Sequence, residues 1–189
     1  RRVPYLQRKA NGYKAFFEHN PRTRFKGDRD RIYEDYRLGK LVDLLLTDQR
    51  QYRERQPCND AILQPCADTE DPRVMLGDKQ MQWLLRSLKG SPATWKVWGS
   101  ELMLMSLRIT AGVAAQVDSW DGYGAERKVI LDYVIDNGIQ NVVAITGDIH
   151  TFFAGTVYPS GGEDGKPAFP EFVGGSATSY GIPEATGLS

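Results

Sequence analysis

The sequence lacks a surplus of charge of either sign and any long apolar run. Its 24 Lys and Arg residues are balanced by 24 Asp and Glu residues, so the formal net charge at pH 7 is zero. Binding to nucleic acid or to an anionic membrane surface needs a basic surplus, so we expect neither partner. A helix that spans a bilayer needs roughly 20 consecutive apolar residues. No run in the sequence approaches that length, so we expect no transmembrane segment.

Cysteine is also scarce, since Cys58 and Cys66 are the only two. Each follows a proline in the polar stretch QPCNDAILQPC, which predicts a loop. Two cysteines in one short loop favour a disulfide in an oxidising compartment over a pair of free thiols, and a metal pair is a poorer third choice. A disulfide would indicate export. The opening residues RRVPY carry no apolar signal segment, but a matured or excised chain would have lost one.

What is present is enough apolar material for one domain. The chain has 189 residues, of which 41% are hydrophobic, and we expect residues 1–189 to form a single domain with its own core. Periodicity predicts helices over residues 6–19, 79–88 and 124–135, with Asp78 capping the second. It predicts strands over residues 32–38, 41–46, 95–98 and 141–146, and one that begins at residue 171. Residues 106–119 and 159–170 are predicted loops, and the fold class is α/β with a mixed sheet.

One predicted strand ends in a chemically distinctive segment. The apolar run 142–146 is followed by Gly147, Asp148, Ile149 and His150, and the chain has only two histidines. Functional groups cluster beyond the carboxyl ends of buried strands in α/β sheets. If Gly147 permits a sharp turn, Asp148 and His150 lie on one side of the next segment, where both can bind a metal. The alternatives are a turn-capping carboxylate and a core histidine, and the pattern alone does not exclude them.

Three more side chains are candidates for contact with a substrate. Arg50 follows the predicted strand 41–46 and has the geometry to bind a phosphate group through two nitrogens, or to pair with nearby carboxylates. Trp120 and Tyr123 occur together in a predicted turn, where they would line a substrate mouth or pack into the core.

Five segments resemble one family in the same order along the chain. VAITGDIH (143–150) is similar to the last metal-binding segment of the PhoD-like alkaline phosphatases, a branch of the calcineurin-like metallophosphoesterases. YLQRKA (5–10) through AFFEHNP (15–21) resembles a helix of that family, and DQRQYR (48–53) resembles a strand end with Gln49 in place of the usual Thr. MLGDKQMQWL (75–84) and DSWDGY (118–123) are similar to a further helix and turn.

The resemblance implies a fold and an activity. The expected fold is the C-terminal half of a β-sandwich with helices outside, and the expected activity is metal-dependent hydrolysis of phosphate esters. It implies a calcium- and iron-containing site in which Asp148 and His150 are ligands. His150 is alternatively the acid that protonates the leaving oxygen. The family's N-terminal half supplies most other ligands, so that half is an expected partner, and relatives with this site are exported.

Two other functions remain open at this stage. Relatives that cleave phospholipid headgroups make a phospholipase D-like phosphodiesterase the enzymatic alternative. The isolated chain, which lacks the expected N-terminal ligands, is alternatively a non-catalytic fragment or module.

Overall fold

A computed structural model describes residues 3–60, 71–110, 113–114, 116–163 and 165–181. The chain divides into two compact units, Arg1–Glu34 and Asp35–Ser189, which are described separately. The single-domain organisation therefore stays a prediction. No helix within the described residues is long and apolar enough to cross a membrane.

The first unit contains one helix, α1 (Tyr5–His19), where a helix is predicted. It ends at Asn20, whose backbone N–H donates to Phe16 O at 2.9 Å and whose extended conformation leads into Pro21. None of its residues is buried. Beyond the helix, the Arg31 guanidinium carbon lies over the ring of Phe25, 4.0 Å from the ring centroid. The negative face of the aromatic ring attracts the guanidinium cation.

The second unit is built on a six-stranded sheet with the order β1-β2-β3-β6-β8-β7. Its strands are β1 (Glu34–Leu38), β2 (Val42–Leu46), β3 (Trp95–Gly99), β6 (Val142–Thr146), β7 (Phe153–Val157) and β8 (Phe169–Val173). The helices are α2 (Asp78–Gly90) and α3 (Gly124–Asp136), with short 3-10 turns η1 (Cys58–Asp60) and η2 (Trp120–Tyr123). A separate antiparallel pair joins β4 (Arg108–Thr110) to β5 (Val113–Ala114). Because parallel and antiparallel pairs occur in one sheet, the prediction of an α/β fold with a mixed sheet is confirmed.

Several predicted boundaries are wrong. β4 and β5 lie in a segment predicted to be loop, β7 is not predicted at all, and β8 begins at Phe169 inside the predicted loop 159–170. Asp78 is the first residue of α2 and not its cap. The cap is Gly77, whose φ of 72° is easily adopted only by glycine. Asp78 instead places a negative charge in the first turn, which suits the helix dipole.

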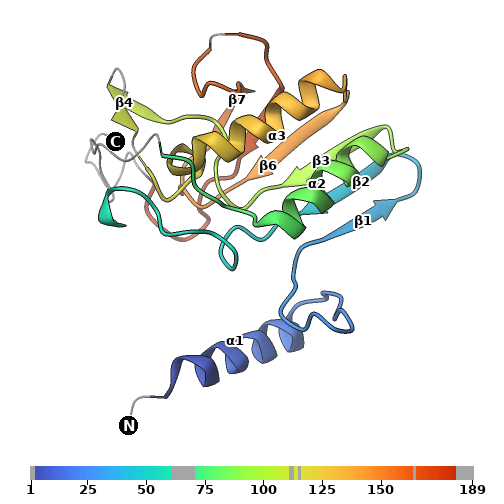
Figure 1. Cartoon of the computed structure of the whole chain (residues 1–189), viewed down its shortest axis with the longest axis vertical. Coiled ribbons are helices and arrows are strands. Elements are labelled where there is room, and N and C mark those ends of the chain that lie inside the picture. Colours follow the sequence, from blue (N-terminus) through green and yellow to red (C-terminus); the bar gives the residue numbers. More distant parts are fainter. Residues whose placement is uncertain (1–2, 61–70, 111–112, 115, 164, 182–189) are drawn as a thin grey trace. The chain divides into compact units, whose positions relative to one another are not determined.

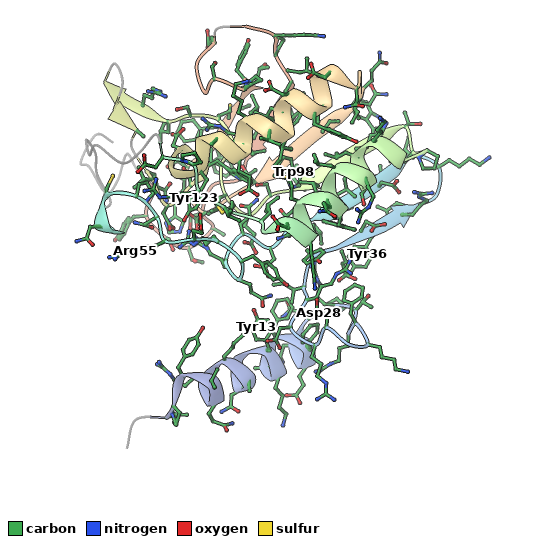
Figure 2. The ribbon with its side chains drawn as sticks, in the orientation of Figure 1. Tyr13, Asp28, Tyr36, Arg55, Trp98 and Tyr123 are labelled. Atoms are coloured by element: carbon green, nitrogen blue, oxygen red, sulfur yellow. The ribbon has the colours of Figure 1, made fainter. Side chains whose placement is uncertain are left out.

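Both helices cover the same face of the sheet (Figure 1). β2, β3 and β6 are parallel neighbours, and α2 and α3 are the crossovers between them. Right-handed crossovers that advance in one direction across a sheet place their helices on one face. Helix residues Leu84, Leu88 and Ile130 pack there against Leu45 and Trp98. Figure 2 shows Trp98 at the centre of this layer.

Candidate functional site

Polar side chains follow three neighbouring parallel strands at the point where each strand ends. Arg50 comes shortly after β2, Glu101 shortly after β3, and Asp148 shortly after β6. The carboxyl ends of parallel strands meet at one edge of a sheet, which is where α/β proteins place ligands. The fold therefore brings together residues that are separated by about 50 to 100 positions in the sequence.

Arg50 joins two carboxylates at this edge. Its Nη1 lies 2.8 Å from Asp118 Oδ2, and its Nη2 lies 3.2 Å from Asp148 Oδ1. Arg53 Nη1 lies 2.6 Å from the other oxygen of Asp118. The strand-end cluster is defined here as Asp48, Arg50, Arg53, Glu101, Asp118 and Asp148. The contacts match the alternative that Arg50 pairs with carboxylates, and its binding of a phosphate group stays a prediction.

A buried carboxylate fixes the backbone that carries Arg50. Asp48 is fully buried, and its Oδ1 accepts the backbone N–H groups of Arg50 at 3.0 Å and Gln51 at 3.1 Å. The Gln80 amide of α2 holds the Asp48 backbone from both sides, accepting its N–H at 2.7 Å and donating to its C=O at 2.8 Å. Buried polar groups that are all satisfied in this way rigidify a segment. The position of Arg50 is therefore set by α2 as well as by β2.

Gln49, which replaces the usual Thr of the resembling family, is integrated into the same edge. It is fully buried, its amide nitrogen donates to Ser100 Oγ at 2.6 Å, and its amide oxygen accepts the Leu102 N–H at 2.8 Å. Its backbone N–H donates to Glu101 Oε2 at 2.9 Å. The substitution therefore ties the segment after β2 to the segment after β3.

The surroundings shift the pKa of two carboxyls in opposite directions. Burial raises the pKa of Asp118, but hydrogen bonds from Arg50 and Arg53 outweigh burial and lower it. The pKa of Glu101 is raised, first by the loss of hydration around its carboxylate and then by the negative charges of Asp48 and Asp148. Arginine contacts thus favour the ionised form of Asp118, whereas burial disfavours the ionised form of Glu101.

The turn that carries Asp148 and His150 has a different geometry from the predicted one. Gly147 is not among the residues with positive φ, so the turn does not use the backbone conformation that only glycine adopts easily at that position. Asp148 and His150 themselves adopt positive φ, 70° and 59°. The prediction that both residues lie on one side of an extended segment is therefore wrong. Asp and His are among the few side chains that tolerate this region, at a cost of order 1–3 kcal/mol each, and such strain clusters at functional sites.

The substrate-contact predictions for the two aromatic residues are not supported by their positions. Trp120 and Tyr123 are fully buried in η2, so neither has surface left for a substrate. Trp120 packs edge-on against Trp98 with ring centroids 6.0 Å apart. The Tyr123 hydroxyl donates to Glu54 O at 2.7 Å, and Figure 2 shows Tyr123 near the start of α3. By contrast His150 is exposed, which removes the alternative of a core histidine.

Sequence reasoning gave no role to Asp118 or Glu101. Asp118 lies within DSWDGY, a segment singled out only by resemblance, and its contacts with two arginines depend on the tertiary fold. Glu101 had a usable signal, because it is a carboxylate that follows a strand end just as Asp148 does. The two tryptophans of β3 are instead typical of a core strand.

The described residues do not complete a metal site. No group of three or more His, Cys, Asp or Glu side chains with suitable spacing is found among them. Asp148 and His150 offer one oxygen and one nitrogen donor, and the Asp148 carboxylate is bound by Arg50. The predicted disulfide stays a prediction, because Cys66 lies outside the described residues.

Comparison with known proteins identifies the family of this chain. The PhoD-like phosphatase model matches residues 2–188. Alkaline phosphatase D of Bacillus subtilis (strain 168) is 32% identical over 184 residues, which are 94% of this chain and 32% of that protein. A solved structure described as the structure of PhoD matches with a TM-score of 0.82 and 33% identity, covering 91% of this chain and 34% of that one. The chain spans about one third of the length of these relatives, and it belongs to the PhoD-like phosphatase family.

Proposed function

We propose that the protein carrying this chain hydrolyses phosphate esters at the strand-end cluster. The observation that carries the proposal is the contact between Arg50, after β2, and Asp148, after β6, across the carboxyl end of the intervening parallel strand β3, with the exposed His150 two residues further on. A guanidinium that binds oxyanions, a carboxylate and an imidazole are suited to phosphate ester chemistry. Family membership supports the same reaction.

Each side chain has a proposed role. Arg50 presents a planar fork of N–H donors that matches two oxygens of a phosphate group. His150, which is exposed, donates a proton to the leaving oxygen. Asp148 is proposed as a metal ligand. In the alternative, His150 is a second metal ligand and not the proton donor.

The proposed calcium and iron rest on the resemblance alone. Since no three His, Cys, Asp or Glu side chains among the described residues group so as to hold an ion, they do not fit a complete site for either metal. We therefore place the remaining ligands in the N-terminal half of the same protein, which is consistent with a chain that covers one third of its relatives. The 189-residue chain alone is expected to hydrolyse phosphate esters poorly.

The location and the ester type complete the proposal. Export to the periplasm, cell envelope or medium is supported by the two cysteines in one loop, and a Cys58–Cys66 disulfide is part of this proposal.

A phospholipase D-like phosphodiesterase is the alternative enzyme. A chromogenic monoester and the matching diester, assayed side by side, distinguish the two.

Replacing Asp148 and His150, the two residues with positive φ after β6, tests the proposed function. In the longer protein, His150→Ala and Asp148→Asn should each lower the rate by about 100-fold or more, because a proton donor or a charged group at the reacting atoms is lost. Melting temperature should change little, since both side chains are exposed. The measurement records rate, bound metal and melting temperature together.

Two matched variants serve as controls. His19→Ala removes the only other histidine, at the C-terminal end of α1, and Asp132→Asn removes an exposed carboxylate of α3. Both should keep the wild-type rate. If His150→Ala and Asp148→Asn lower the melting temperature sharply while the rate per folded molecule and the metal content hold, the site assignment is wrong.

A further inference from the structure

Residues 74–80, which lead into α2, lie along residues 48–54, which carry both arginines of the strand-end cluster. At one end of this pairing Glu54 N–H donates to Val74 O at 2.8 Å, and Val74 N–H donates to Glu54 Oε2 at 2.8 Å. At the other end the contact is made by the side chain of Gln80. The segment that carries the arginines is therefore held at both of its ends by one other segment.

The Gln80 contact is a buried clamp on the backbone of Asp48. The Gln80 side-chain oxygen accepts the Asp48 N–H at 2.7 Å, and its nitrogen donates to Asp48 O at 2.8 Å and to Leu76 O at 3.0 Å. The residue is only 1% exposed, so these bonds do not compete with bulk water. Because the N–H and the C=O of Asp48 are both held, its position and its orientation are fixed together.

The clamp reaches Arg50 through one more hydrogen bond. Asp48 Oδ1 accepts the Arg50 N–H at 3.0 Å, so the backbone of Arg50 is tied to the residue that Gln80 holds. The Arg50 side chain is 42% exposed at its ion pairs with Asp118 and Asp148. Ion pairs with that exposure hold a side chain weakly. The fixed backbone therefore contributes to where the guanidinium lies.

We infer that Gln80 is a positioning residue, which acts through the backbone of Asp48 to hold Arg50 where it binds the phosphate group of the substrate. This inference rests on the proposed function. A binding group that is ordered before its ligand arrives loses less conformational freedom on binding, and the difference is gained as affinity. Gln80 is buried beneath the cluster and does not touch the substrate. If Gln80 only ties α2 to the sheet, its loss lowers stability and leaves phosphate affinity unchanged.

A double-mutant cycle for phosphate binding tests the inference. In the longer protein, Gln80→Met keeps the side-chain length but removes the clamp, and it should weaken binding of inorganic phosphate about three- to tenfold. In an Arg50→Lys protein the same substitution should weaken phosphate binding less than about twofold, because effects that pass through one residue are not additive. Calorimetric titration with sodium phosphate below the melting transition gives the four affinities.

Two variants of α2 are the matched controls. Gln82→Met makes the same chemical change at an exposed position, and Leu88→Val removes a buried methylene near the far end of the helix. Leu88→Val should lower the melting temperature, and neither control should change phosphate affinity. The inference is wrong if Gln80→Met weakens phosphate no more than Leu88→Val does, or weakens it equally with and without Arg50. Gln80→Asn, whose amide is one methylene too short, replaces Gln80→Met if that variant does not fold. If neither variant folds, Gln80 is a stability residue and the inference is wrong.

The side-chain Nε–H signal of Arg50 separates this inference from the proposed function. In nuclear magnetic resonance spectra of the 189-residue chain, Gln80→Met should shift or broaden that signal and Gln82→Met should not. If Arg50→Lys binds phosphate as tightly as wild type, the role of Arg50 in the proposed function fails. A shifted signal then still shows that Gln80 positions Arg50, whereas an unchanged signal overturns the positioning itself.

Discussion

At the scale of single residues, Asp43 shows how a buried charge makes stability depend on pH. Its side chain is only 4% exposed, and Arg37 donates to its two oxygens at 2.6 and 2.7 Å while the Ser91 hydroxyl donates a third hydrogen bond. Hydrogen bonds from Arg37 lower the pKa of Asp43 more than burial raises it. Between the lowered pKa and the ordinary value of 3.8, the unfolded chain binds more protons than the folded one.

The expected result is acid sensitivity that Asp43→Asn removes. The stabilisation from Asp43 is fully present above its unfolded pKa and is lost as the pH falls through the lowered folded pKa. Asp43→Asn should be less stable near neutral pH by about 1–3 kcal/mol, because the charged hydrogen bonds are weakened. The gap to wild type should narrow as the pH falls below about 4. Urea unfolding of both proteins from neutral to acidic pH measures this gap, and a constant gap contradicts the assignment.

Asp148 and His150 show what sequence reasoning can and cannot do at this scale. The sequence makes both residues candidates, because a carboxylate and a scarce histidine after a buried strand form a visible pattern. It did not predict their left-handed backbone, because φ at a turn depends on contacts that the sequence does not display. The exposed state of His150 and the burial of Trp120 and Tyr123 followed from tertiary packing in the same way.

At the scale of elements, Glu171 links three segments near the site. It is fully buried on β8, and its carboxylate accepts the N–H groups of Leu104 at 2.8 Å and Met105 at 2.6 Å and the hydroxyl of Thr146 at 2.8 Å. Thr146 is the last residue of β6 and directly precedes Gly147. Glu171 therefore fixes the end of the strand from which the turn at Asp148 starts.

Replacing Glu171 with Gln tests this link without changing the side-chain shape. The amide has one acceptor oxygen and an NH2 group that must face at least one of the three donors, so we expect a loss of about 1–3 kcal/mol in stability. Thermal unfolding of the chain gives the value. Glu163→Gln, on an exposed loop, should have no effect, and equal behaviour of the two variants contradicts the role of Glu171.

The elements that the sequence did not predict have two physical causes. β7 contains Gly155, where an added Cβ would lie 2.6 Å from Met105 Sδ, so the glycine reflects close packing and not a loop. β4 and β5 are three and two residues long, too short for a hydrophobic period to show. The longer helices have clear periods, and β2, β3 and β6 are apolar or aromatic runs, so all of them were predicted near their observed bounds.

At the scale of the whole second unit, α2 and α3 cover one face of the sheet, and the side chains on the opposite face are apolar too. β2, β3, β6 and β8 pair in a register that aligns the residues pointing away from α2 and α3. These residues are Val42, Leu44, Leu46, Trp95, Val97, Val143, Ile145 and Phe172. None is fully buried, and Trp95, Ile145 and Phe172 are 42%, 45% and 53% exposed. Strands that are apolar on both faces occur in sheets covered on both sides.

The open face predicts different behaviour for the chain and for the longer protein. In the 189-residue chain, Ile145→Thr combined with Phe172→Thr should reduce self-association and dye binding, because a large exposed apolar patch promotes both. The strands should persist, since Thr is β-branched and suits a pleated surface. In the longer protein, where strands that are apolar on both faces predict a covered second face, the same pair should lower stability by about 1–3 kcal/mol through lost apolar burial. Sedimentation and urea unfolding of both forms measure the effects. A longer protein whose stability is unchanged, with a chain that is monomeric before substitution, would show that this face of the sheet is a solvent face and has no covering partner.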